Sequence, residues 1–569
     1  KVDQGINSNT FTFTVPSLDC SQDPSECIWE IHVKAYNENG EAHQEWVIST
    51  LNESEAPDIF DYFTDKKYQS RTETDPWGRA LPEWTPSDSP DTSLGYLRNV
   101  PGTSKATLKT TSGFAYGTWK VKFLLHRPAG TGHPWFDLHY LINDNNSLYW
   151  QLLNDGHHHC YFRLNHDQIV FDPTHDMTSR VKYDVWHDLT IIRTPDGWIY
   201  AFLDGILDWK WQEKSVTTSD YIMIMGGDSL GVNIMQADAV QAYNGKYLFP
   251  IKGIYYGNYT YACDASSPPK ELKKEGIVIK GRNVRLSDIA DAINNPSLFT
   301  YDTKTKTAIS YTNLFLYYGS ELVIKDETLK FHCESDGELE FAIGYGATLK
   351  IENSTIDSDT EHYYVWNFAG ATTHWGYPLY PLWYGAGGPQ ILSWASYVSV
   401  IINNSVINNS AYFFLDSPLE ARITNTQFTN MNEVDIGTYL NGGGTWNKNC
   451  MEAAKGNKSV WFYIDNIDVL DFAFKNVKIT GKTPINIHFQ TNAHRDKLNI
   501  YNVDFGDGNV VVKETLAQTG GSTGLQSHSC YVDGSAGPWG PIYKWKSYID
   551  SEIGLVNCKF KDIIIAPGI

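Results

Sequence analysis

The second half of the chain repeats one pattern of apolar and polar positions. Two apolar residues flank a variable position, an Asn or Asp follows two positions later, and another apolar residue comes three positions after that. Alternating apolar residues put two side chains on one face of a short strand, and Asn suits the next turn because it tolerates left-handed backbone. The copies begin at Leu322, Leu349, Val400, Ala421, Phe472, Leu498 and Ile553.

A repeat of this length predicts a solenoid of stacked coils, in this case a parallel β-helix. Stacking would align the Asn residues of successive copies into a ladder, in which each side-chain amide bonds to the next. Some steps between copies, such as the one from Leu349 to Val400, are about twice as long as the step from Leu322 to Leu349. We therefore expect an additional, unmarked coil inside each long step.

The first half of the chain follows the period of strands instead. Residues 10–15 and 28–33 alternate polar and apolar side chains, which is typical of half-buried strands. Residues 52–105 are rich in Pro, Asp, Ser and Thr and are expected to form an irregular excursion. Short alternating segments then recur between turns over residues 106–245, and this spacing predicts a β-sandwich.

The boundary between the two halves is marked by Ser and Pro at 266–269, followed by a charged segment. Residues 286–293 have helical spacing, with Ser287 as the expected N-cap, and a helix there would cover the open end of the first coil. The predicted all-β chain has an N-terminal sandwich with its leading strand and excursion over 1–250, a connector with the capping helix over 251–304, and a parallel β-helix over 305–569.

Residues 105–245 resemble the laminin-G-like, concanavalin-A-like jelly-roll family. The resemblance rests on a Trp-led strand ending in Arg at 186–193, an aromatic strand ending in Asp-Gly at 198–205, and an entry strand at 112–119. It implies a jelly roll that binds sugars or proteins. Residues 305–569 resemble the pectate-lyase-like right-handed parallel β-helix superfamily through their repeat pattern.

Charge and hydropathy narrow the partners. The 569 residues carry a net charge of −21, with a pI of about 5.2, and no basic cluster is visible, so a nucleic-acid partner is not expected. No stretch of 18 apolar residues occurs, so no membrane span is expected. The chain begins at Lys1 without an apolar leader, which we interpret as a mature secreted protein that is extracellular or on the cell surface.

Glycan sequons support the same interpretation. The expected glycosylation sites are Asn52, Asn145, Asn258, Asn403, Asn408 and Asn457. A further sequon at Asn353 falls on a ladder position, so this residue is expected to be buried and unmodified.

The eight cysteines fit four disulfides in an oxidising compartment. They are Cys20, Cys27, Cys160, Cys263, Cys333, Cys450, Cys530 and Cys558. Cys20 and Cys27 are close enough to form a local pair, whereas the other pairings stay open. Buried free thiols are the alternative, and the absence of C-x-x-C argues against zinc ribbons and haem attachment.

The segment 363–397 interrupts the repeat and is unusually aromatic. A pyranose ring stacks on aromatic faces, so we expect this loop either to pack against the sandwich or to meet a sugar or another subunit. Its candidate ligand-binding residues are Tyr364, Trp366, Trp375, Tyr377, Trp383, Tyr384 and Trp394.

Catalytic signatures are sparse. The paired carboxylates of β-helix hydrolases and the Glu-x-Asp-x-x-Glu pattern of jelly-roll glucanases are both missing, and Asp137 is the one carboxylate in the comparable strand. The remaining acid–base candidates are Asp504, Asp507, His494 and Arg495, with a turn or solvated loop as the alternative. No organic cofactor is expected. Calcium is the candidate ion, with Asp144, Asp155 and Asp228 as ligands at the sandwich rim.

These observations favour a secreted surface glycoprotein with an adhesive, carbohydrate-binding or structural role, for example as a sheath or filament subunit. Its partners would be a polysaccharide or other glycan and further copies of itself, with residues 10–15 adding a strand to a neighbouring subunit. Two alternatives remain. One is a secreted polysaccharide lyase or glycoside hydrolase with a β-helix cleft, and the other is a viral receptor-binding spike.

Overall fold

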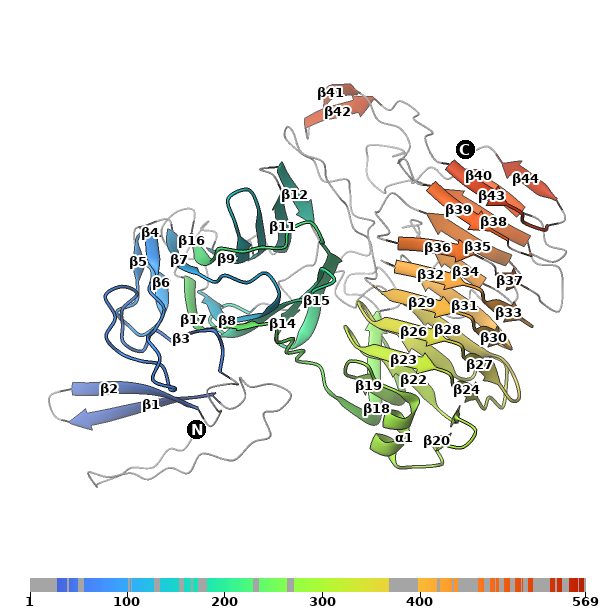
Figure 1. Cartoon of the computed structure of the whole chain (residues 1–569), viewed down its shortest axis with the longest axis horizontal. Helices are drawn as coiled ribbons and strands as arrows, with labels where there is room; N and C mark the ends of the chain where they lie inside the picture. The colour runs from blue at the N-terminus through green and yellow to red at the C-terminus, as the bar shows by residue number, and fades with distance from the viewer. Residues whose placement is uncertain are drawn as a thin grey trace.

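The described part of the chain is almost entirely β-structure, with one short helix (Figure 1). The computed structural model describes residues 28–37, 40–49, 56–100, 103, 105–126, 134–152, 158–164, 167–171, 182–228, 235–262, 271–367, 398–416, 420–431, 434–437, 459–464, 471–475, 477–479, 486–491, 497–502, 504, 510–514, 533–537, 540–544, 552–560 and 562–566. Within these residues, no helix combines the length and the apolar character needed to cross a membrane.

Two antiparallel sheets of the first half face each other across one core. Sheet A has the order β12 (Asp167–Phe171), β11 (His158–Leu164), β10 (Ser147–Leu152), β9 (Pro134–Ile142), β16 (Tyr221–Asp228), β7 (Lys105–Thr111) and β4 (Thr85–Asp88). Sheet B has the order β15 (Ile206–Gln212), β14 (Trp198–Leu203), β13 (His187–Arg193), β8 (Gly117–Leu125), β17 (Met235–Asn244), β6 (Leu97–Asn99) and β5 (Pro90–Asp91), and β3 (Ile59–Asp61) also pairs with β17. Phe123 of sheet B stacks on Phe136 of sheet A with ring centroids 4.7 Å apart. The predicted sandwich is therefore confirmed.

A separate hairpin precedes the sandwich. Its strands are β1 (Ile28–Asn37) and β2 (Gly40–Ser49), which pair in antiparallel register (Figure 1). The strand predicted at 28–33 lies within β1, whereas the one predicted at 10–15 lies outside the described residues.

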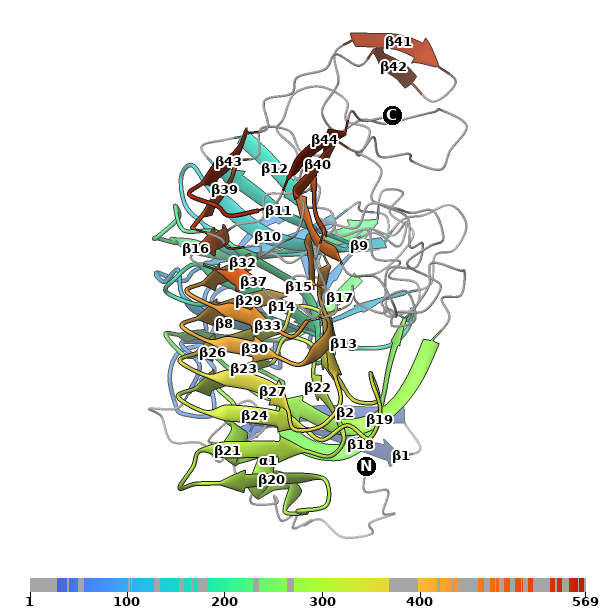
Figure 2. The same cartoon turned by 90° about the vertical axis from the view of Figure 1, so that its right-hand side faces the viewer.

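Three sheets with parallel strands make up the second half (Figure 2). Sheet C has the order β18 (Gly253–Ala262), β19 (Glu271–Lys280), β22 (Asn313–Leu316), β25 (Glu340–Ile343), β28 (Tyr363–Asn367), β31 (Ser410–Asp416), β34 (Val434–Gly437), β35 (Ser459–Ile464), β38 (Asn486–Thr491), β40 (Val510–Glu514) and β44 (Ile563–Ala566). Sheet D has the order β20 (Phe299–Asp302), β21 (Thr307–Ser310), β24 (Thr328–Phe331), β27 (Thr355–Ser358), β30 (Val406–Asn408), β33 (Gln427–Thr429) and β37 (Lys478–Ile479). Sheet E has the order β23 (Glu321–Lys325), β26 (Thr348–Glu352), β29 (Ser399–Asn403), β32 (Glu420–Thr424), β36 (Asp471–Lys475), β39 (Lys497–Tyr501) and β43 (Glu552–Val556). A last hairpin joins β41 (Asp533–Gly537) to β42 (Gly540–Lys544).

From β22 to β33 the strands enter sheets C, E and D in rotation, so each strand from β22 to β31 pairs with the strand three positions later. In the first four repeats, the two apolar residues point into one shared core. Leu322 and Ile324 of β23 are fully buried there, whereas Val323 between them is partly exposed on the outer face. The repeat pattern therefore predicts both the strands and their inner faces correctly.

The Asn and Asp positions of the repeat that the structure describes adopt left-handed backbone, as expected, with φ of 50° at Asn353 and 48° at Asn404. The ladder is confirmed between Asp326 and Asn353, whose Oδ1 and Nδ2 are 3.2 Å apart, and between Asn502 and Asn557 at 2.9 Å. The expectation that Asn353 is buried is wrong, because the ladder runs along the outside of the turn and leaves this residue exposed.

The unmarked coils expected inside the long steps are absent from the described strands of sheet E. β26 pairs directly with β29, β32 with β36, and β39 with β43. None of these long steps therefore adds a strand to sheet E, whereas β34 and β35 both join sheet C within the step from β32 to β36.

The helix is present, but Ser287 is not its N-cap. The helix α1 (Leu286–Ile293) is preceded by Arg285, whose backbone N–H donates to Asp288 Oδ2 at 2.7 Å. The N-cap lies two residues before the predicted one, and Leu286 is fully buried in the core of the parallel sheets, together with Ile289. It lies at the β20 end of the stack in Figure 2.

The sandwich contacts the parallel sheets through β14 and β15. A Cβ at Gly346 would lie 1.9 Å from Leu207 Cδ2, so the absence of a side chain permits this close approach. Tyr345 Oη donates to the Asp208 carbonyl at 2.8 Å. Lys210 is almost fully buried in the same junction.

Candidate functional site

The candidate site is built from residues 56–100, which wrap around one end of the sandwich. Arg71 anchors this segment by donating hydrogen bonds to Asp61 and Asp65, both almost inaccessible to solvent. Trp84 Nε1 donates to Asp61 Oδ2 at 2.6 Å. Burial raises the pKa of Asp61 above the ordinary aspartate value, and the hydrogen bond from Arg71 offsets part of that increase. This buried group fixes the path of the chain between β3 and β4.

An apolar floor forms where β3 adds to sheet B. Phe60 stacks on Tyr62 with ring centroids 4.9 Å apart and meets Trp77 edge-on at 5.4 Å. Leu81 and Ala239 complete this small cluster. The floor is separate from the main sandwich core, and its members Phe60, Tyr62, Leu81 and Ala239 are at most 8% exposed.

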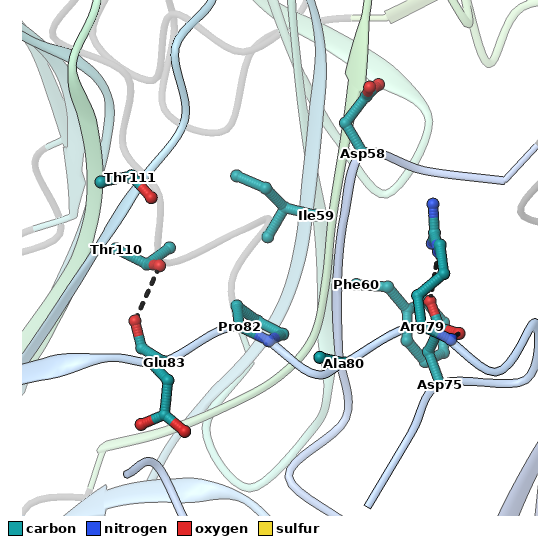
Figure 3. Close-up of a pocket in the computed structure, with 10 residues that line it drawn as sticks. All are labelled: Asp58, Ile59, Phe60, Asp75, Arg79, Ala80, Pro82, Glu83, Thr110 and Thr111. Carbon is teal, nitrogen blue, oxygen red and sulfur yellow. Dashed lines mark hydrogen bonds and ion pairs between the residues drawn. The ribbon is translucent and has the colours of Figure 1, made fainter. Parts of the chain in front are cut away.

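A cavity of about 400 Å³ opens beside this floor (Figure 3). Its lining residues are Asp58, Ile59, Phe60, Asp75, Arg79, Ala80, Pro82, Glu83, Thr110 and Thr111. The volume lies in the range of small-ligand sites, which combine an apolar surface with a few polar groups that fix orientation.

Polar groups surround the apolar surface. Figure 3 shows Asp58 and Glu83 at opposite ends of the cavity, with Ile59 and Pro82 between them. Asp58 Oδ2 accepts a hydrogen bond from the Asn244 backbone N–H at 2.7 Å. The two Glu83 oxygens accept from consecutive backbone N–H groups, those of residues 70 and 71, at 2.9 and 3.0 Å. Both carboxylates are thus held in place while their residues remain exposed.

A second polar group lies on the outer face of β9 and β10, but it is covered. Asp137 accepts a hydrogen bond from Gln151 Nε2 at 2.9 Å, and His139 stacks on Tyr149 with ring centroids 4.1 Å apart. Asp137 has no exposed surface and His139 has 7%. A ligand therefore does not reach this carboxylate, so the cavity is the stronger candidate.

One group of described residues brings metal-ligating atoms together in the turns before β25 and β28. Ligand atoms of Asp336, Glu361 and His362 lie within 4.8 Å of one another. His362 Nδ1 and Asp336 Oδ1 are 2.6 Å apart, and the hydrogen bond to His362 helps to lower the pKa of Asp336, against the opposing effect of burial. Imidazole with carboxylate suits zinc or manganese better than calcium.

The aromatic candidates are placed only in part. Tyr364 is wrong as a ligand-binding residue, because β28 continues sheet C and leaves this side chain 2% exposed. The side chain of Trp366, in the same strand, is outside the description. Trp375, Tyr377, Trp383, Tyr384 and Trp394 lie outside the described residues.

The acid–base and calcium candidates are not brought together in the described part of the chain. Asp504 is partly exposed, with Oδ1 3.6 Å from Lys559 Nζ, and Asp144 is exposed in the turn between β9 and β10. Asp228 ends β16, and its side chain is outside the description. Asp507, His494, Arg495 and Asp155 lie outside the described residues.

The disulfide expectation is wrong for Cys333, which is a free thiol fully buried in the core of the parallel sheets. Cys558 packs against the same core, with its Sγ 3.7 Å from the Val556 carbonyl oxygen. Burial raises the pKa of Cys333 to about 11, so it stays protonated. Cys20, Cys27, Cys160, Cys263, Cys450 and Cys530 have no described side chain.

Among the sequons, Asn145 and Asn258 are exposed. Asn403 and Asn408 are partly exposed, and Asn408 Nδ2 donates to Asp357 Oδ1 at 2.9 Å. Asn52 and Asn457 lie outside the described residues.

Sequence reasoning missed the cavity itself. Eight of its ten lining residues fall in the segment expected to be an irregular excursion. The concentration of Pro with acidic and aromatic residues was the available signal, but it does not reveal which residues meet Thr110 and Thr111 of β7.

Comparisons with known proteins add no family. No protein-family model matches the chain, and a comparison with curated proteins gave no match. Among solved structures, the carbohydrate-binding module CBM66 from Bacillus subtilis is 9% identical, covering 28% of this chain and 93% of its own, with a TM-score of 0.22. A β-glucanase from Bacillus licheniformis is 13% identical, covering 33% and 97%, with a TM-score of 0.23. The potassium-bound carbohydrate recognition domain of Emp46p is 15% identical, covering 28% and 88%, with a TM-score of 0.22. Similarities at this level carry no functional argument, so function is argued from the cavity.

Proposed function

We propose that this chain is a secreted carbohydrate-binding protein of the cell surface, in which the cavity beside the sandwich holds a sugar unit. The observation that carries the proposal is the combination of an accessible apolar lining at Ala80 and Pro82 with hydrogen-bonding groups at the edges of the cavity. Ile59 and Phe60 also line the cavity but are only 6% and 4% exposed. A pyranose presents an apolar ring face and a rim of hydroxyls, and such a cavity matches both.

The rest of the chain fits a display role. We infer that the sandwich is a jelly roll and that the three parallel sheets form a right-handed β-helix. The rotation of strands among these sheets and their inward apolar residues support the second inference. The exposed sequon residues Asn145 and Asn258 support secretion and glycosylation. A stiff stack of coils would hold the binding cavity away from the surface that carries it.

Binding to an array of immobilised glycans tests the proposal. Ala80 lines the cavity and is exposed, so Ala80→Trp fills the cavity without entering a core. We expect this variant to lose at least ~10-fold in affinity, about 1.4 kcal/mol. Ala292→Trp, on the exposed face of α1, is the matched control and should bind as the parent protein does.

Two results would contradict the proposal. Absence of binding across the array would contradict carbohydrate binding. Equal binding by the two tryptophan variants would show that the cavity is not the binding site. Mass spectrometry of the glycans after incubation separates binding from turnover, because new oligosaccharides would instead support the lyase or hydrolase alternative.

A further inference from the structure

The cavity carries an excess of negative charge. Its ten described lining residues include three carboxylates and one cation, the Arg79 guanidinium. Arg79 Nε donates to Asp75 Oδ2 at 2.7 Å, and a second guanidinium nitrogen donates to the Pro57 carbonyl at 2.8 Å. Because Arg79 is already paired with Asp75, the charges of Asp58 and Glu83 are left without a cation among the lining residues.

Arg71, which lies outside the lining, does not supply the missing charge. Arg71 donates its backbone N–H to Glu83, but its buried guanidinium is bonded to Asp61 and Asp65. The backbone donors at Asp58 and Glu83 orient these carboxylates without neutralising them. Each carboxylate oxygen accepts more than one hydrogen bond, so both groups keep capacity for a ligand.

We propose that the cavity selects sugars that carry a free amino group, an inference that rests on the carbohydrate-binding function proposed above. An ammonium group donates charge-assisted hydrogen bonds to carboxylates, and these are stronger than the bonds from neutral hydroxyls. A uronate, in contrast, would bring a third uncompensated negative charge next to Asp58 and Glu83. An oligosaccharide of amino sugars repeats its ammonium groups along the chain and reaches both ends of the cavity.

Calorimetric titration of the full chain with four matched tetrasaccharides tests the selection. The probes are a glucosamine tetramer, its fully N-acetylated form, a glucose tetramer and a galacturonate tetramer, all at pH 6. We expect the glucosamine tetramer to bind at least ~10-fold more tightly than the two neutral tetramers. This preference should shrink as salt is raised, because screening weakens interactions of exposed charges. The galacturonate tetramer should bind most weakly.

Variants that remove the negative charges test whether the preference for amino sugars arises in this cavity. Glu83→Gln and Asp58→Asn keep the size of each side chain and remove its charge. Because both residues line the cavity, the readout in the double variant is the ratio of the glucosamine-tetramer affinity to the neutral-tetramer affinity, not either affinity alone. The preference for the glucosamine tetramer should fall to less than about 3-fold. Asp291→Asn, on the exposed face of α1, is the matched control and should keep the full preference.

The outcomes separate this inference from the underlying function. Equal binding of charged and neutral tetramers by the parent protein would overturn amine selection and leave carbohydrate binding intact. A preference that survives in the double variant would overturn the assignment to this cavity. Failure of all four tetramers, together with a negative array, would overturn both the inference and the proposed function.

Discussion

At the residue scale, the buried ion group of Asp61, Arg71 and Asp65 determines whether the cavity exists. These side chains are at most 2% exposed, so the single guanidinium compensates two carboxylates in a region of low dielectric. Removing one partner of a buried ion pair leaves an uncompensated charge, which costs more than the pair itself contributes.

Arg71→Met should therefore lower the free energy of unfolding of the sandwich by about 3–5 kcal/mol. Urea unfolding followed by tryptophan fluorescence measures the change, since Trp84 contacts Asp61 directly. Arg98→Met is the control, because Arg98 and Asp91 are about one-fifth exposed, and such pairs contribute roughly 0–1 kcal/mol. Similar losses in the two variants would show that the buried group does not determine stability.

The same residues show why the site was not predictable. A local pattern identifies residues 52–105 as irregular, but the partners Asp61, Arg71 and Trp84 are separated by ten or more positions and meet only after β3 has paired with β17. Tyr364 illustrates the opposite error. Its aromatic neighbours suggested a surface loop, while the sheet register buries it.

At the element scale, the turn after each strand of sheet E depends on left-handed backbone. Asn404 follows β29 with a φ of 48° and is exposed. A residue with a Cβ pays about 1–2 kcal/mol in this conformation, and Asn is among the few that visit it routinely. The repeat could be predicted for this reason, since the turn selects Asn at the same position of every coil.

Replacing Asn404 by Val should accordingly destabilise the parallel sheets by at least about 1–2 kcal/mol. Asn404→Gly, which keeps access to positive φ, should cost less. Thermal unfolding followed by circular dichroism compares the two variants with the parent protein. If Gly proved as damaging as Val, the Asn side chain and not its backbone conformation would be what the turn requires.

What the pattern did not predict at this scale is which long steps add a strand to which sheet. Spacing alone suggested extra coils in the long steps, but β26 and β29 pair directly. A coil and an excursion consume similar numbers of residues, and only the pairing of strands distinguishes them. The prediction of the helix N-cap was wrong for a related reason. Burial of Leu286 inside the helix outweighed the preference of Ser287 for the N-cap position.

At the scale of the whole molecule, one lysine links the sandwich to the parallel sheets. Lys210 of β15 donates from Nζ to Ser399 Oγ at 2.8 Å and to Thr348 Oγ1 at 3.1 Å. Its ammonium also lies 4.7 Å from the centre of the Trp198 ring. The Gly346 carbonyl oxygen, 3.5 Å from Nζ, is a third acceptor. Glu321 and Glu420 stand in register with these hydroxyl residues on neighbouring strands of sheet E.

Burial, reinforced by the nearby charge of Arg282, lowers the pKa of Lys210 to about 7, while Glu420 and Glu321 oppose the decrease and Lys350 adds to it. Between pH 7 and the ordinary lysine value of 10.5, the unfolded chain therefore binds a proton that the folded protein does not. Stability rises with pH wherever the unfolded state binds more protons.

The midpoint temperature of unfolding should accordingly increase from pH 7 to pH 9 in the parent protein relative to Lys210→Met, in which this titration is absent. Below pH 6 both states hold the proton, so the difference between the two proteins should become constant. Every other titrating group is present in both proteins, so the variant controls for them. If the midpoint temperatures of the two proteins changed in parallel from pH 6 to pH 9, Lys210 would remain charged in the junction.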